Sequence, residues 1–191
     1  MIDTNSIEII PSLLTHDECN ILNNWAILNR NKFFKKSYIG ENRLTTRFST
    51  NLEFEYPSLI IEKFNELKNK LGLSDYLNYP EGKDGIVCAI TNKNGELRNH
   101  LDPKLPNSES LHFLIKTLNG GEGGEFYIND THYPLNEGDC LIFYASVLKH
   151  KLTKITGNGD RVSWFFSISI PKYINKNINE NSVNIHSPFW I

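Results

Sequence analysis

Cysteine is scarce in this sequence, and the few cysteines form no recognisable pattern. The 191-residue chain contains three, Cys19, Cys88 and Cys140, and none of them forms a Cys-x-x-Cys pair with another. An odd and scattered set argues against a disulfide framework. No cationic and apolar signal segment opens the chain either. We therefore expect a cytoplasmic protein whose thiols pack in the interior and form no bridges.

A surplus of one charge and a long apolar run are also missing. The 20 Lys and Arg residues stand against 22 Asp and Glu, for a formal net charge of −2, and no basic stripe is present. Nucleic-acid binding depends on concentrated positive charge, so no nucleic-acid partner is expected. No apolar run is long enough to cross a bilayer, so no membrane association is expected. The length suits one domain with a sizeable core.

Helical signals lie in the first part of the chain. Thr15 and Glu18 have the spacing of a capping box, and the apolar residues that follow recur at helical intervals, which predicts a helix to about Arg30. A second amphipathic helix is predicted over 56–71, with Gly72 as its C-terminal cap. A short edge strand over 7–10, ended by a proline, precedes both helices.

The stretch 33–51 is rich in Arg, Thr and Phe and has no clear period. We interpret it as strands and a loop near the mouth of a site. Arg43 and Arg47 would then lie in a lid, although a structural role is an equally ready explanation for them.

From Gly85 onwards the pattern changes to short strands separated by turn residues. A turn is predicted over 92–95, and a hairpin is predicted across Asn129 and Asp130. The predicted strands number about eight: 86–90, one that carries His100, 111–118, 125–128, 132–134, 140–144, 148–155 and 161–170. Short strands with turns throughout indicate a mainly β sandwich or jelly roll with N-terminal helices. We divide the chain into a supporting region 1–84, a core 85–170 and a polar tail 171–191.

A His-x-Asp pair and a distant histidine form the main candidate site. His100 and Asp102 are two residues apart, so in a strand they point the same way. His150 would be brought to them by the fold. Two imidazoles and one carboxylate can occupy one face of a non-haem Fe(II) and leave the opposite positions open.

The ordered set of motifs resembles the Fe(II)/2-oxoglutarate-dependent dioxygenase superfamily, and most closely its prolyl-hydroxylase-like branch. The resemblance covers 85–170 and rests on five motifs: His100-x-Asp102, Gly123-Gly124-Glu125 before a strand, Gly138-Asp139 before an apolar strand, His150, and Arg161-x-Ser163. His-x-Asp alone is weak, but the motifs occur in the family's order, with Arg161 at a short interval after His150.

The resemblance implies a cupin-like double-stranded β-helix that uses Fe(II), 2-oxoglutarate and O2. His100, Asp102 and His150 would hold the metal, and Arg161 would bind the far carboxylate of 2-oxoglutarate with help from Ser163. The reaction would hydroxylate an unactivated C–H bond of an amino acid, peptide side chain or other small molecule, with succinate and CO2 as co-products. Related halogenases lack the metal carboxylate, so Asp102 favours hydroxylation.

The chain departs from the prolyl-hydroxylase-like pattern at one strand end. Relatives often have Tyr-Leu-Asn there, where this chain has Thr117-Leu118-Asn119, and that tyrosine helps to hold 2-oxoglutarate. Thr117 or the neighbouring Lys116 would take over this role. Arg98, two residues before His100, should share its face and could bind an acidic substrate group, or it could form a structural ion pair.

Less specific interpretations exist for each residue. His150 could be a hydrogen-bonded structural histidine, and Arg161 could pair with Asp160. Asp139 fits a turn better than a metal site. The four remaining histidines have no partner pattern and are assigned structural or surface roles: His16, His112, His132 and His186.

Two other functions remain open beside the hydroxylase. The same jelly roll could bind Zn²⁺ through its two histidines and one aspartate as a hydrolase or isomerase, although Arg161-x-Ser163 would then have no purpose. It could also be a non-catalytic binding module, which usually loses a metal ligand, and none is lost here.

Overall fold

The computed structural model describes residues 3–35, 40–46, 54–78 and 85–172. Two α-helices, one short 3-10 helix and ten strands make up this part of the chain. The helices are α1 (His16–Leu28), η1 (Arg30–Lys32) and α2 (Ser58–Lys70). The strands are β1 (Ile7–Ile10), β2 (Phe34–Lys35), β3 (Gly40–Thr45), β4 (Ile86–His100), β5 (Ser108–Leu118), β6 (Phe126–Ile128), β7 (Thr131–His132), β8 (Cys140–Tyr144), β9 (His150–Leu152) and β10 (Arg161–Pro171).

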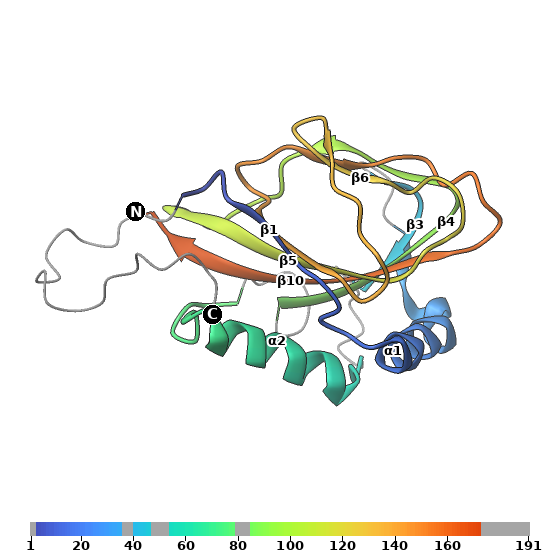
Figure 1. The fold of residues 1–191 in the computed structure, drawn as a ribbon, viewed down its shortest axis with the longest axis horizontal. Coiled ribbons are helices and arrows are strands. Elements are labelled where there is room, and N and C mark those ends of the chain that lie inside the picture. The colour runs from blue at the N-terminus through green and yellow to red at the C-terminus, as the bar shows by residue number, and fades with distance from the viewer. Residues whose placement is uncertain (1–2, 36–39, 47–53, 79–84, 173–191) are drawn as a thin grey trace, which may run out of the picture.

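All strand pairs are antiparallel and form one curled sheet in the order β1-β8-β5-β10-β4-β9-β6-β7, with β3 on β4 and β2 on β3. Strand β4 makes the curl possible because it is long. Its first part, 86–91, pairs with β10, and its last part, from Leu97 to His100, pairs with β9. Figure 1 shows the resulting two layers, with α1 and α2 both beneath the layer that contains β5 and β10. This is the predicted mainly β jelly roll with N-terminal helices.

The helix ends follow the sequence signals. Thr15 accepts a hydrogen bond from the Glu18 amide (3.3 Å), and the Glu18 carboxylate accepts one from the Thr15 amide (2.8 Å), so the predicted capping box is confirmed. Gly72 follows α2 with a φ of +66°, as its predicted role as a cap requires. None of the helices in the described part of the chain is both long and apolar enough to cross a membrane.

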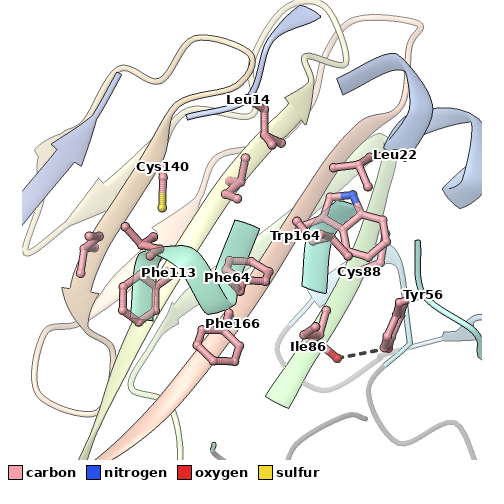
Figure 2. Close-up of a cluster of buried hydrophobic side chains, with 14 of the residues drawn as sticks. Leu14, Leu22, Tyr56, Phe64, Ile86, Cys88, Phe113, Cys140, Trp164 and Phe166 are labelled. Atoms are coloured by element: carbon pink, nitrogen blue, oxygen red, sulfur yellow. Dashed lines mark hydrogen bonds between the residues drawn. The ribbon is translucent and has the colours of Figure 1, made fainter. Parts of the chain in front are cut away.

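Strand alternation separates two groups of apolar side chains. The even-numbered residues of β10 from Val162 to Ile170 join a core against the helices, where Phe64 of α2 stacks on Phe166 (Figure 2; ring centroids 4.8 Å apart). Leu114, Leu141 and Phe143 belong to a second cluster, inside the curl. Because side chains alternate along a strand, the odd-numbered residues of β10 face the interior, Arg161 and Ser163 among them. The three cysteines are buried free thiols, as predicted.

The predicted turn over 92–95 is wrong. Strand β4 runs through it without interruption. The pairing of β3 shifts there from Glu41 opposite Glu96 to Arg43 opposite Thr91, so the additional residues of β4 form a bulge. The hairpin across Asn129 and Asp130 is confirmed, with φ values of +47° and +66°. Arg47 and nearly all of the predicted tail lie outside the described residues.

Two glycines with positive φ make a matched test of the turn before β8. Gly138 (φ +89°) lies against α1, and a Cβ there would overlap the carbonyl oxygen of Leu14, whereas a Cβ at Gly72 would meet nothing within 4 Å. Gly72→Ala should lower the free energy of unfolding by about 1 to 2 kcal/mol through backbone strain alone. Gly138→Ala should lower it by about 2 to 5 kcal/mol, because the overlap adds to that strain. Urea unfolding measures both, and equal losses would contradict this packing.

Candidate metal centre

Three predicted ligands meet where β4 ends and β9 begins. His100 is the last residue of β4 and pairs directly with His150, the first residue of β9. The Asp102 amide donates to the carbonyl of Ala145 (2.9 Å), which holds the carboxylate beside the two rings. The ligand atoms of the three residues all lie within 4.8 Å of one another. The set is the two-histidine, one-carboxylate arrangement of non-haem iron sites.

Both imidazoles have a defined orientation. His100 Nδ1 lies 2.7 Å from the Arg98 carbonyl oxygen, and His150 Nδ1 lies 3.1 Å from that of Leu148. A carbonyl oxygen only accepts, so each Nδ1 must carry the hydrogen. Each Nε2 then has a free lone pair for a metal, and His100 Nε2 lies 3.3 Å from Asp102 Oδ1.

Burial determines the protonation state of His150. It lowers the pKa of this imidazole to about 3, although the nearby Asp102 carboxylate acts in the opposite direction. His150 is therefore neutral at neutral pH, which is the form that binds a metal.

His112 also lines this pocket, so the prediction that it has no partner is wrong. It extends from β5 with 3% of its surface exposed, and its Nε2 lies 3.2 Å from Asp102 Oδ2. A donor on Oδ2 leaves Oδ1 facing His100 and so orients the carboxylate. The signal available in the sequence was the alternation of 111–118, which places His112 on the face of Leu114 and Lys116.

The three candidate ligands line a pocket with mainly apolar walls. Leu97, Phe126, Phe143 and Phe165 are among these walls, and Arg43 is the one cation among the described residues that line it. Such walls exclude water from the positions that a metal would leave open.

Arg161 faces the same interior and has 2% of its surface exposed. It donates to the Ser163 hydroxyl, its Nε has no hydrogen-bond partner, and no carboxylate in the described part of the chain forms an ion pair with it. Asp160, the alternative partner, pairs with Arg30 instead (2.7 Å). Burial, together with the like charge of Arg43, lowers the pKa of Arg161 to about 9. A buried guanidinium with a free donor suits an anionic ligand.

Lys116 and Thr117 differ in their surroundings. Lys116 donates to the Leu135 carbonyl, and burial, with a smaller contribution from Arg161, lowers its pKa. Thr117 is the additional residue of a β-bulge, since Lys116 and Leu118 pair with consecutive residues of β10. The Thr117 hydroxyl lies 3.5 Å from the Val162 carbonyl, and its own carbonyl accepts from the Asn23 amide (2.8 Å). Of the two, only Lys116 interacts electrostatically with Arg161.

Arg98 does not point into the site. Its side chain is 59% exposed and forms an ion pair with Glu41 on the neighbouring strand. The rule of alternation fails here because the register of β4 against β9 shifts between Leu97 and His100. Arg98 therefore forms a structural ion pair, which was the alternative to a role in substrate binding.

The fold is shared with solved structures of low sequence identity. A viral collagen prolyl hydroxylase from Paramecium Bursaria Chlorella virus-1, in complex with 2OG, is 20% identical with a TM-score of 0.64, and the match covers 88% of this chain and 98% of that one. A Pseudomonas putida prolyl-4-hydroxylase is 13% identical with a TM-score of 0.67, over 87% and 94% of the chains. HygX from Streptomyces hygroscopicus, with nickel and 2-oxoglutarate bound, is 13% identical with a TM-score of 0.61, over 88% and 84%.

No family model and no curated protein matches the sequence. At these identities the structural matches establish the fold. The jelly roll of this chain is therefore the one found in prolyl hydroxylases and in a 2-oxoglutarate-bound enzyme.

The contact between His112 and Asp102 predicts an effect on metal affinity. His112→Ala should weaken Fe(II) binding by about 10- to 100-fold, because the carboxylate loses the donor that orients it. His132→Ala, at an exposed histidine of β7, is the control and should leave the affinity unchanged. Anaerobic competition against a chromophoric chelator measures both, and an unchanged affinity in His112→Ala would remove the orienting role.

Proposed function

We propose that this chain is an Fe(II)- and 2-oxoglutarate-dependent dioxygenase that hydroxylates an unactivated C–H bond. One observation carries the proposal. A largely buried set of two imidazoles and one carboxylate shares an interior with Arg161, a buried cation that has no described counter-ion. A zinc hydrolase or a binding module would need the two imidazoles and the carboxylate, but it would have no need of the buried cation.

The residues have distinct roles in this proposal. His100, Asp102 and His150 would hold Fe(II) on one face. The bound metal, with 2-oxoglutarate and O2, supplies the oxidising chemistry, and succinate and CO2 are the co-products. Arg161, with Ser163, would fix the far carboxylate of 2-oxoglutarate and so orient the molecule along the interior. Lys116 adds positive charge at this end.

The substrate class stays broad: an amino acid, a peptide side chain or another small molecule. The structurally similar proteins support this range, since they include a collagen prolyl hydroxylase and HygX, which was also solved with hygromycin B. The net charge of −2 gives no support to a nucleic-acid substrate. A cytoplasmic location is part of the proposal and is supported by the three buried free thiols.

Succinate formation tests the proposal directly. Protein loaded with Fe(II) and supplied with 2-oxoglutarate and O2 should release succinate slowly even without substrate, and Asp102→Ala should abolish the release. Absence of succinate from wild-type protein that demonstrably holds iron would favour the zinc hydrolase or the binding module.

A separate prediction concerns Arg161. Arg161→Gln should retain the metal, because the side chain is not a ligand, but should weaken 2-oxoglutarate binding by about 10- to 100-fold through loss of a charge-assisted bond. Arg30→Gln is the matched control, because Arg30 is a partly exposed arginine that pairs with Asp160. Calorimetric titration of metal-loaded protein without oxygen gives both affinities. Equal 2-oxoglutarate affinity in wild type and Arg161→Gln would remove Arg161 from the co-substrate site.

A further inference from the structure

We infer that Arg43 of β3 is a second anchor for the far carboxylate of the co-substrate and acts as a pair with Arg161. The inference rests on the function proposed above and assigns a binding role to a residue outside the motifs of the core strands. It predicts a pocket that selects 2-oxo acids with a distal carboxylate through two guanidinium groups from opposite sides of β4.

Strand register places the two arginines on either side of one residue. Thr91 of β4 pairs with Arg43 on one side and with Arg161 on the other, so the three residues form a row across β3, β4 and β10. Directly paired residues of antiparallel strands extend to the same face of a sheet. Arg43 Nη1 donates to the Thr91 hydroxyl (3.3 Å), and only 6% of the Arg43 surface is exposed. Both guanidinium groups therefore belong to the interior of the curl.

The Arg43 side chain extends from this row towards the metal-binding residues. Its guanidinium carbon lies 5.3 Å from the centroid of the Phe165 ring. Phe165 is four residues beyond Arg161 on the same face of β10, and Phe165 and Arg43 line one pocket with His100, Asp102 and His150. Arg43 therefore lines the pocket together with the three candidate ligands, and Arg161 is not among the residues that line it.

The buried charge of Arg161 lacks a counter-ion among the described residues. Two guanidinium groups close together in a buried site repel each other, and Arg43 contributes to the low pKa of Arg161. Lys116 adds a third cation within electrostatic reach of Arg161. Buried like charges are costly unless a counter-charge accompanies them, and no described carboxylate forms an ion pair with Arg161. The distal carboxylate of 2-oxoglutarate would supply that charge at this row of residues.

The contribution of Arg43 to binding of the distal carboxylate can be measured with two ligands that differ only in that group. 2-Oxoglutarate and 2-oxopentanoate share the 2-oxo acid end that chelates a metal, but the second ends in a methyl group. Their dissociation constants are measured anaerobically by calorimetry on full-length protein loaded with Fe(II). The variants are Arg43→Gln and Arg43→Lys, with Arg98→Gln as a matched control at a surface arginine. Metal content and melting temperature are recorded for each protein.

In Arg43→Gln, the affinity for 2-oxoglutarate should fall by about 10- to 100-fold, while that for 2-oxopentanoate stays within about twofold of wild type. Arg43→Lys should recover part of the loss, since it retains the charge but not the forked donor geometry. Arg98→Gln should behave as wild type.

Two results would overturn the inference while the proposed function stands. One is an unchanged 2-oxoglutarate affinity in Arg43→Gln beside a weakened one in Arg161→Gln. The other is an equal loss for both ligands with reduced metal content, which would make Arg43 a structural residue. If wild-type protein that holds Fe(II) binds no 2-oxoglutarate, the proposed function fails together with the inference.

Discussion

The antiparallel pairing of β4 with β9 is the constraint on which the site depends. It sets His100 opposite His150, although fifty positions separate them in the chain. The same strand β4 pairs through its first part with β10, and so links the candidate metal ligands to the strand that carries Arg161. One long strand with two partners thus determines both ends of the proposed co-substrate site. The bulge in β4 lies between these two pairings, where the strand passes from one layer to the other.

Alternation along the strands lets one sheet serve both stability and chemistry. On β10, Val162, Trp164 and Phe166 pack against the helices, while Arg161 and Ser163 face the interior. The helices therefore stabilise the outer face without contributing to the proposed chemistry. The interior holds charges that would destabilise an ordinary core, because buried cations are costly without a counter-charge. In this account, that cost is offset when an anionic co-substrate binds.

Local signals in the sequence predicted local structure well. The capping box of Thr15 and Glu18, the cap at Gly72 and the Asn129-Asp130 hairpin each depend on residues a few positions apart, and the structure contains all three. The candidate ligands were predicted from the order of their motifs, and the structure brings the three residues together. Features that depend on register between distant strands were missed: the bulge at 92–95, the outward direction of Arg98, and the contact between His112 and Asp102. Residues two positions apart share a face only where a strand is regular. The register of β4 shifts at two places, once against β3 and once against β9.

The central claim is that one interior holds both an Fe(II) ion and the 2-oxo acid that chelates it. Anaerobic titration of Fe(II)-loaded protein with 2-oxoglutarate, followed by visible absorption spectroscopy, tests it most directly. The account predicts a weak metal-to-ligand charge-transfer band that saturates at one equivalent and is absent with succinate. Full iron occupancy without any such band would contradict the account, since the three ligands would then hold a metal that takes no part in 2-oxoglutarate chemistry.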